Sequence, residues 1–284
     1  MTAENEIKEE HKLYRGFYIN LDRAVLRREQ MEQRLADAGL AGRYERFCAI
    51  DGRTITYGPE ALPGSAALGC TLSHLSLIKS QQGADLHIHI LEDDAVLHPE
   101  IGRVLENFVA LKQEDQWDVL MTDIFVPPDV YLFKHLHKSY RELSATGSLS
   151  FFDIGTWEFA CASSYFVNKN SIEKFVQMME HQFPAETPYD LRIRELAKQK
   201  MLKVFLCFPF FSTVSELSTD SNIAGGFQHV LPLTEYRRSF YVSPDFESIS
   251  RNLARYSDID ADDPHMRTYM NLIRCLIAPE HAAF

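Results

Sequence analysis

Short apolar runs alternate with longer segments of helical spacing along most of this chain. Residues 16–21 and 46–52 are short, apolar and bordered by polar positions, which is typical of buried strands. Residues 24–38, between them, have helical spacing and precede Gly39, a plausible residue for ending a helix. A strand, a helix and a second strand in this order predict two parallel strands joined by a right-handed crossover.

The alternation continues through the rest of the chain. Further strands are expected at residues 87–91, 118–122, 159–167 and 203–209. Further helices are expected at residues 68–79, 99–111, 170–179, from 188 onward, and 267–278, with Leu111 on a buried face. These elements predict an α/β fold, a sheet flanked by helices.

Two regions depart from this regular pattern. Residues 123–156 contain a Pro-Pro pair, several aromatic residues and a Ser/Thr/Gly run, so we expect an irregular lid or acceptor loop, or else a mobile surface insertion. Beyond Gly226 the pattern is mixed. We therefore expect one domain over residues 1–226 and a mostly helical extension over residues 227–284 that packs on it.

The strand at residues 87–91 ends in three consecutive carboxylates, Glu92, Asp93 and Asp94. Ligands of open α/β sheets bind beyond the carboxyl ends of the strands. If the chain stays extended, Glu92 and Asp94 point one way and Asp93 the other. Two carboxylates on one side suit a hard divalent cation such as Mg²⁺ or Mn²⁺. The alternative is that Asp94 caps a helix and the other two are solvated.

Composition narrows the classes of protein that remain. The chain has 284 residues, is 45% hydrophobic and carries a net charge of -11, so it can bury a large core and is an unlikely partner for nucleic acid. Its five cysteines are scattered without CxxC spacing, which indicates reduced thiols in the cytoplasm. We expect neither a signal peptide nor a spanning helix.

Two smaller features could also carry chemistry. Arg27 and Arg28 lie near the start of the helix expected at residues 24–38, where positive charge opposes the helix dipole; a bound phosphate would offset this, and a solvated basic face is the alternative. Cys70 and His74 are spaced to share one helix face. Two such residues without further partners are weak evidence for zinc, and packing or hydrogen bonding is the simpler interpretation.

Several short motifs occur in a fixed order, and together they are more specific than any one alone. They are INLDR at 19–23, AIDG at 49–52, LGCTLSHL at 68–75, ILEDD at 90–94, YD at 189–190 and STDSNI at 218–223. In this order the chain resembles glycosyltransferase family 25, the group that includes bacterial lipooligosaccharide galactosyltransferases. The resemblance covers about Phe17 to Ile223. An acidic residue usual before the Gly-Cys pair is replaced here by alanine and leucine.

The resemblance implies a GT-A fold, with a Rossmann-type sheet flanked by helices. It also implies an inverting transfer from a UDP-sugar, most often UDP-galactose, to a saccharide or glycolipid acceptor such as lipopolysaccharide core. It implies a divalent cation, Mn²⁺ or Mg²⁺, on Asp94 and Glu92. Residues that would border or bind the donor are Asn20, Leu21, Arg27, Ser73, His74, Asp93 and Asp220. A lipid-linked acceptor would bring this cytoplasmic protein to the inner membrane as a peripheral protein.

Inversion requires a general base that takes the proton of the acceptor hydroxyl. Asp190 is the first candidate, with a helix cap as its alternative role. Two other functions stay open. A non-catalytic scaffold in a glycan-assembly complex would have no need of the carboxylate triplet. A metal-dependent nucleotidyl or phosphoryl transferase would normally carry a glycine-rich phosphate loop, and we find none.

Overall fold

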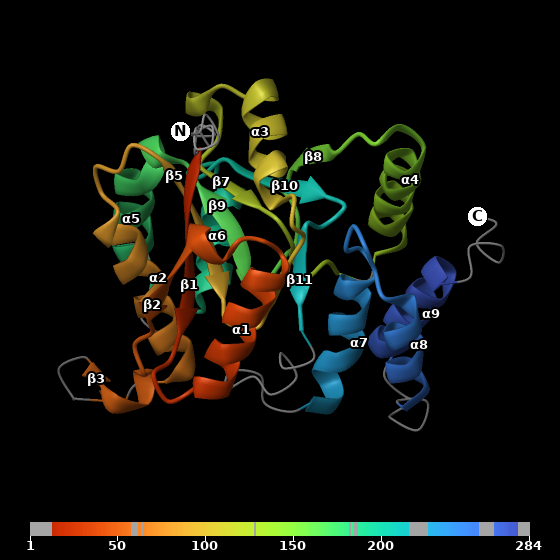
Figure 1. Ribbon diagram of the computed structural model, residues 1–284, viewed down its shortest axis with the longest axis horizontal. Coiled ribbons are helices and arrows are strands. Elements are labelled where there is room, and N and C mark those ends of the chain that lie inside the picture. The colour runs from red at the N-terminus through yellow and green to blue at the C-terminus, as the bar shows by residue number, and fades with distance from the viewer. Residues whose placement is uncertain are drawn as a thin grey trace, which may run out of the picture.

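A seven-stranded sheet forms the centre of the molecule (Figure 1). The computed structural model describes residues 13–57, 62–63, 65–127, 129–181, 183–184, 187–215, 227–255 and 264–277. The strands lie in the order β2-β1-β5-β9-β7-β10-β8. Pairing directions show that β9 and β8 run opposite to the other five strands. The sheet is therefore mostly parallel, and the parallel strands end at a common edge.

The strands of this sheet are short and largely buried. Their bounds are β1 Tyr14–Asn20, β2 Tyr44–Cys48, β5 His87–Glu92, β7 Val119–Met121, β8 Ser150–Asp153, β9 Ser164–Val167 and β10 Val204–Phe208. Two small antiparallel pairs lie outside it: β3 Thr56–Tyr57 with β4 Leu62–Pro63, and β6 Ala95–Leu97 with β11 Ser212–Val214.

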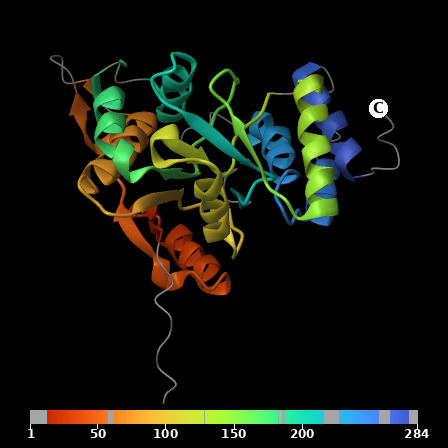
Figure 2. The same ribbon diagram turned by 90° about the horizontal axis from the view of Figure 1, so that it is seen from above.

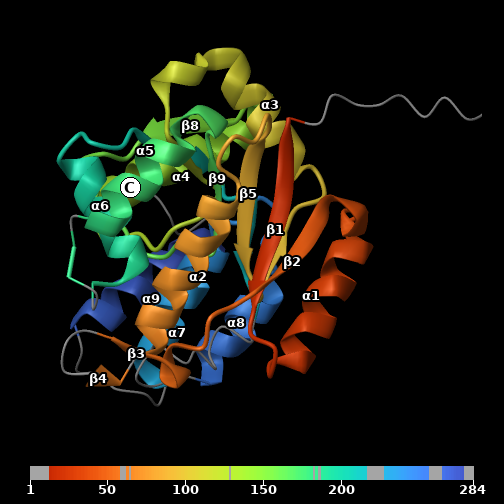
Figure 3. The same ribbon diagram turned by 90° about the vertical axis from the view of Figure 1, so that its left-hand side faces the viewer.

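Helices cover both faces of the sheet, as the three layers in Figure 3 show. On one face lie α2 Ala66–Ser80, α5 Ile172–His181 and α6 Tyr189–Lys198. On the other lie α1 Val25–Asp37 and α3 Ile101–Leu111. Side chains alternate along each strand: Ile88 and Ile90 of β5 face the first layer, whereas Leu91 faces the second. This alternation builds one apolar core on each side of the sheet.

The C-terminal part of the described chain is helical and packs against the end of the sheet. It comprises α7 Phe227–Arg238, α8 Phe246–Arg255 and α9 Pro264–Ile277. Figure 2 shows α4 Val130–Thr146 lying beside these blue helices. Phe240 packs on Phe208 of β10, and the Tyr269 hydroxyl donates to the Val126 carbonyl at 3.1 Å. These contacts join the C-terminal helices to the same core.

The predicted α/β architecture, with helices around a mostly parallel sheet and a helical C-terminal region, is confirmed. The predicted helix over residues 24–38 corresponds to α1, and Gly39 follows it with φ +69°. The helix predicted from residue 68 begins at Ala66, because the Ser65 hydroxyl accepts the Leu68 N–H at 3.1 Å and caps it.

Other expectations were wrong. Residues 123–156 are not an irregular loop, since they contain α4 and the edge strand β8, which pairs with β10. Leu111 ends α3 with 69% of its surface exposed, because the buried stripe of that helix ends at Phe108. The strand expected from residue 159 begins at Ser164, after Cys161 adopts φ +76°. The helix expected with Ile172 and Met179 inward is present as α5 and begins at Ile172, but Asn168, not Asn170 or Ser171, caps the 3₁₀ turn before it.

Two glycines allow a very close backbone approach between α2 and the turn after β2. A Cβ on Gly69 would lie 2.4 Å from the Gly52 nitrogen and 2.6 Å from the Ile50 oxygen. These contacts are shorter than any side chain tolerates. They hold the start of α2 against the segment that carries Asp51. Among the described residues, no helix is both long and apolar enough to cross a bilayer.

Candidate active site

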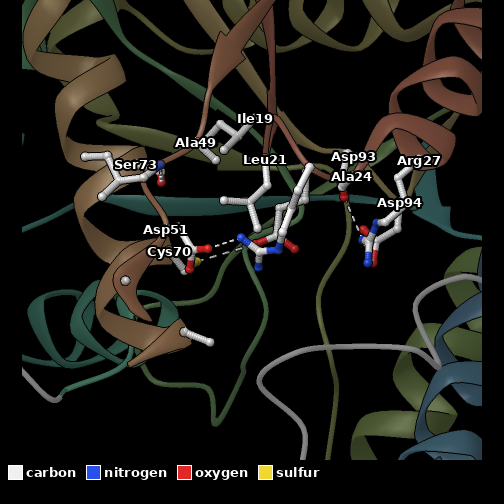
Figure 4. A pocket seen from close by; sticks show the side chains of 15 residues that line it. Ile19, Leu21, Ala24, Arg27, Ala49, Asp51, Cys70, Ser73, Asp93 and Asp94 are labelled. Carbon is white, nitrogen blue, oxygen red and sulfur yellow. Dashed lines mark hydrogen bonds and ion pairs between the residues drawn. The ribbon is translucent and has the colours of Figure 1, made fainter. Parts of the chain in front are cut away.

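A pocket opens at the edge of the sheet where β1 and β5 end. Figure 4 shows Asp93, Asp94 and Arg27 on one side of it and Ser73, Cys70 and Asp51 on the other. Six of the predicted donor and metal residues line this pocket: Leu21, Arg27, Ser73, Glu92, Asp93 and Asp94. The structure therefore brings together residues that are up to 73 positions apart in the sequence.

The three carboxylates do not alternate as an extended strand would. Strand β5 ends at Glu92, and Asp93 and Asp94 lie in the turn before β6. The Nη2 atom of Arg27 lies 2.6 Å from Asp93 Oδ1 and 3.1 Å from Asp94 Oδ2. Asp93 and Asp94 thus share one guanidinium. The expectation that Asp93 points away from Asp94 was wrong, because the chain turns directly after Glu92.

Arg27 has a role that its position in α1 alone did not reveal. Burial would lower the pKa of Arg27, but the neighbouring charges of Asp94 and Asp93 outweigh that effect and raise it. The arginine is therefore a fixed cation beside the acidic turn. The contact of Arg27 with two carboxylates explains why a positive charge is tolerated in the first turns of α1.

Asn20 holds Asp93 from behind the pocket. Its amide donates to Asp93 Oδ2 at 2.7 Å, and its side-chain oxygen accepts from Arg46 Nε at 3.1 Å. Arg34, which sequence reasoning did not single out, donates to the Asp93 carbonyl at 2.8 Å. Burial raises the pKa of Asp93, while Arg27 and Asn20 oppose that shift. The position of Asp93 is therefore set by contacts from β1 and α1.

Asp94 has the most unusual environment of the three acids. Burial raises the pKa of Asp94 to about 6, the charge of Glu92 adds to the shift, and Arg27 opposes it. Its Oδ1 atom is buried and makes no hydrogen bond within the described part of the chain. A buried carboxylate oxygen without a partner is costly unless a cation or donor meets it. Asp94 together with the nearby Glu92 therefore fits a hard divalent cation.

Glu92 faces α2. Its Oε1 atom lies 3.5 Å from His74 Nε2 and 3.7 Å from Cys70 Sγ. Burial raises the pKa of Glu92, but the hydrogen bond and charge of His74 outweigh it, and the net shift is downward. The side chain of Glu92 is still 34% exposed and lines the pocket. His74 therefore lies one contact behind the pocket and orients a carboxylate there.

Ser73 shapes the pocket wall. Its hydroxyl accepts the Ile50 N–H at 2.8 Å and donates to the Gly69 carbonyl at 2.6 Å. Because both bonds tie the segment after β2 to α2, the hydroxyl supports the same close approach as the two glycines. Asp51, beside it, pairs with Arg23 and Arg53 at the mouth of the pocket.

Asp190 does not lie among the described residues that line the pocket. It is in the first turn of α6, where Oδ1 accepts the Leu191 N–H at 2.9 Å and Oδ2 accepts the Cys161 N–H at 2.6 Å. The residue at the cap position itself is Pro188. Asp190 thus fixes the backbone at Cys161. Asp220, the remaining predicted donor residue, lies outside the described residues.

A buried ionic cluster next to the site went unnoticed in the sequence. Arg237 of α7 contacts Asp123, which follows β7, and also the Ser163 hydroxyl, and donates to Cys161 Sγ at 3.1 Å. Its charge acts on Glu92 and Asp94 as well, where it lowers the pKa of each carboxyl. No local pattern could have shown this, because Asp123 and Arg237 are 114 residues apart.

Comparison with known protein families assigns this chain to one of them. The sequence model of glycosyltransferase family 25 (LPS biosynthesis protein) matches residues 14–193, which is more than half of the chain. No curated protein matches the sequence significantly. The matched region contains β1, α1, the acidic turn, α2 and the start of α6, so it includes every described residue of the pocket. The chain belongs to glycosyltransferase family 25, and it is a glycosyltransferase.

Proposed function

We propose that this protein is a metal-dependent, inverting glycosyltransferase that moves a sugar, for which we propose galactose, from a UDP-sugar to a glycan acceptor. The acceptor would be a saccharide or glycolipid such as lipopolysaccharide or lipooligosaccharide core. Family membership supports glycosyl transfer related to lipopolysaccharide. The observation that carries the finer proposal is the buried, unpartnered Oδ1 of Asp94 beside Glu92 in the pocket.

The residues around Asp94 and Glu92 suit the departure of a nucleoside diphosphate. A divalent cation held by these two carboxylates would act as a Lewis acid on the charge that the leaving diphosphate gains. Arg27 is a fixed cation at the same turn, where it contacts both Asp93 and Asp94. When the donor binds, its phosphate oxygens can replace one of these carboxylates as a partner of the guanidinium. Leu21 and Ala49 provide apolar surface for the nucleoside at the other end of the pocket.

Asp93 and Asp190 are the two proposed participants in the transfer itself. Asp93 is held by Asn20 and Arg27 with its carboxylate toward the pocket, which suits a contact with the ribose or the donor sugar. We retain Asp190 as the candidate base for the acceptor hydroxyl. Both of its oxygens accept backbone N–H groups, which favours a structural role and makes the Asp190→Asn variant decisive.

The test is release of UDP from a panel of UDP-sugars without added acceptor, measured with Mn²⁺, with Mg²⁺ and with EDTA. We expect one UDP-sugar to be hydrolysed slowly, and only when the cation is present. Release that continues in EDTA would contradict metal dependence. If no UDP-sugar of the panel releases UDP, and UDP does not raise the melting temperature of the protein, the result would instead favour the non-catalytic scaffold.

The same assay can follow the acceptor. Addition of lipooligosaccharide core or its lipid-linked form should accelerate UDP release from the correct donor. If only the lipid-linked form does so, we expect the protein to sediment with vesicles that contain the acceptor. This result would support peripheral association with the inner membrane.

A further inference from the structure

Three side chains of different chemistry converge between α2 and the end of β5, at the wall of the pocket. Cys70 and His74 come from successive turns of α2, and Glu92 comes from the end of β5. One ligand atom from each, Sγ, a ring nitrogen and a carboxylate oxygen, lies within 4.8 Å of the other two. Cys70 and Glu92 line the pocket, and Figure 4 shows Cys70 on its wall.

Two of the three separations between these atoms are close to the edges of a tetrahedron around a zinc ion. Zinc is bound at about 2.3 Å by sulfur and about 2.0–2.2 Å by nitrogen and oxygen, so neighbouring ligand atoms lie roughly 3.3–3.6 Å apart. The observed separations from Glu92 Oε1 are 3.5 Å to His74 Nε2 and 3.7 Å to Cys70 Sγ. The third pair, from Cys70 and His74, lies within 4.8 Å, so an ion could be accommodated once these two side chains approach each other.

The surroundings of His74 suit a metal ligand. Only 1% of His74 is exposed, and its Nε2 faces Glu92 Oε1 at 3.5 Å. The other ring nitrogen, Nδ1, is 2.9 Å from the Tyr165 hydroxyl, which in turn is 2.6 Å from the Tyr189 hydroxyl. The ring also stacks on Tyr189 with centroids 4.3 Å apart. Partners of this kind fix the orientation and tautomer of metal-binding histidines.

We propose that Cys70, His74 and Glu92 bind a thiophilic divalent cation of the Zn²⁺ class, with its fourth position open to the pocket. Thiolate and imidazole ligands favour zinc over Mg²⁺ or Mn²⁺, so this site differs in chemistry from the oxygen site at Asp94. When the ion binds, the Cys70 thiol releases its proton to solvent and the thiolate sulfur forms the bond to the metal.

This cation would regulate the transfer through Glu92. The carboxylate is shared between the zinc-class site and the proposed cation site of the donor, so occupancy of the first removes a ligand from the second. We therefore expect Zn²⁺ to inhibit turnover while Mn²⁺ supports it. This consequence rests on the proposed function, whereas the binding itself does not.

The binding test uses Co²⁺ as a spectroscopic probe on the full-length, metal-free protein with a thiol-free reductant. We expect a thiolate-to-cobalt charge-transfer band and tetrahedral d–d bands that saturate at one ion per chain and disappear when Zn²⁺ is added. The Cys70→Ser variant should lose the charge-transfer band, and its Zn²⁺ affinity should fall by more than ~100-fold, beyond the ~10–100-fold typical of a lost outer partner. Cys48→Ser, at an exposed cysteine, is the matched control and should keep the band.

The result that overturns the proposal is a cobalt spectrum without the charge-transfer band, or a band that survives in Cys70→Ser. Thermal melts of both variants identify loss of folding, and Tyr165→Phe provides a second measurement, since it should weaken Co²⁺ binding ~10–100-fold while the band remains. Absence of both UDP release and a UDP-induced rise in melting temperature, with a normal cobalt spectrum, would reject the proposed function alone. Metal-dependent UDP release without the cobalt band would reject the zinc-class site alone.

Discussion

Arg237 and Asp123 form an ion pair in which the side chains are only 2% and 0% exposed. The pair joins α7, which lies beyond the family match, to the end of β7, which lies within it. Burial raises the pKa of Asp123, and Arg237 opposes that shift. Because the charge of Arg237 also favours the ionised forms of Glu92 and Asp94, the C-terminal helices contribute charge to the acidic turn.

Replacing Arg237 with methionine should therefore destabilise the protein strongly. The change leaves Asp123 as a buried carboxylate without its cation, a loss that costs about 3–5 kcal/mol in buried pairs. Urea unfolding measures the free energy of unfolding. The double variant Arg237→Met/Asp123→Asn should recover part of the loss, and Arg251→Met, at an exposed arginine of α8, should change little. Equal stability of the Arg237 variant and the wild type would show that the pair is not a stabilising link.

Asp94→Asn should abolish metal-dependent UDP release, by at least about 100-fold, because an amide is a far poorer ligand for a hard cation. The fold should survive, since Arg27 keeps its contact with Asp93. Activity is measured as UDP release in Mn²⁺, and folding is measured by thermal melting. Asp85→Asn, at an exposed site before β5, serves as the control. Turnover at the wild-type rate in the Asp94 variant would remove this residue from the metal site.

Asp190→Asn separates a catalytic role from a structural one. Its two carboxylate oxygens accept two backbone N–H groups, and an amide retains only one acceptor oxygen, so one donor loses its partner. We expect a loss of about 1–3 kcal/mol in the free energy of unfolding. UDP binding, measured by calorimetry, reports the integrity of the pocket. A variant that melts like the wild type and binds UDP but transfers no sugar would identify Asp190 as the base.

Two buried histidines should lower the free energy of unfolding in mild acid. Burial lowers the pKa of His87 to about 4 and that of His89 to about 3, from an ordinary value of 6.5. Below pH 6.5 the unfolded chain therefore binds protons that the folded rings do not, and each histidine costs about 1.4 kcal/mol per pH unit. The raised pKa of Asp94 acts in the opposite direction, because the folded state then binds the proton more readily.

Comparison with a variant isolates the contribution of one ring. His89→Gln should make the free energy of unfolding fall less steeply between pH 6.5 and pH 4, by about 1.4 kcal/mol per unit. His135→Gln, at an exposed ring of α4, is the matched control. Urea midpoints at several pH values give both slopes. Parallel curves for the wild type and the His89 variant would contradict the assignment.

Gly69→Ala tests the wall of the pocket. The added methyl group would meet backbone atoms at 2.4–2.6 Å, so α2 must move away from the segment at Gly52 at a cost of about 1–3 kcal/mol. We also expect weaker UDP binding, because Cys70 and Ser73 move with the helix. Gly102→Ala in α3 is the matched control: its Cβ would lie 3.6 Å from the Tyr14 ring, so it should gain about 0.5–1 kcal/mol. Unchanged UDP affinity in Gly69→Ala would show that the wall can relax.

The parts of the fold that could be predicted from sequence are those with local signals. Strand β5 and its carboxylates are contiguous in the sequence, and Gly39, with positive φ, follows α1. The spacing of apolar residues and the position of this glycine were therefore sufficient to predict both elements. Helix α4 was missed because Pro127 and Pro128 precede it and its buried residues, such as Phe133 and Leu136, lie among histidines and lysines. The two prolines and the weak apolar stripe gave no clear helical pattern in the sequence, because the stability of this helix comes from packing.

The site was less predictable than the fold. Glu92 contacts α2 and Asp93 shares Arg27 with Asp94 because the chain turns at residue 93, and strand alternation does not apply beyond a turn. Cys70 and His74 gain significance only when Glu92 is seen beside them. Long-range pairs such as Arg237 with Asp123 leave no periodic mark in a single sequence.

Strand β9 has a consequence for how this protein is made. It lies between β5 and β7, runs antiparallel to both, and is formed by residues 164–167, well after either neighbour. While the ribosome is still synthesising the first 160 or so residues, those two apolar strands lack their shared partner. Pairing between distant segments is slow and leaves strand edges open to aggregation. We therefore expect a strong dependence on chaperones during synthesis, and insoluble product from any message truncated before this strand.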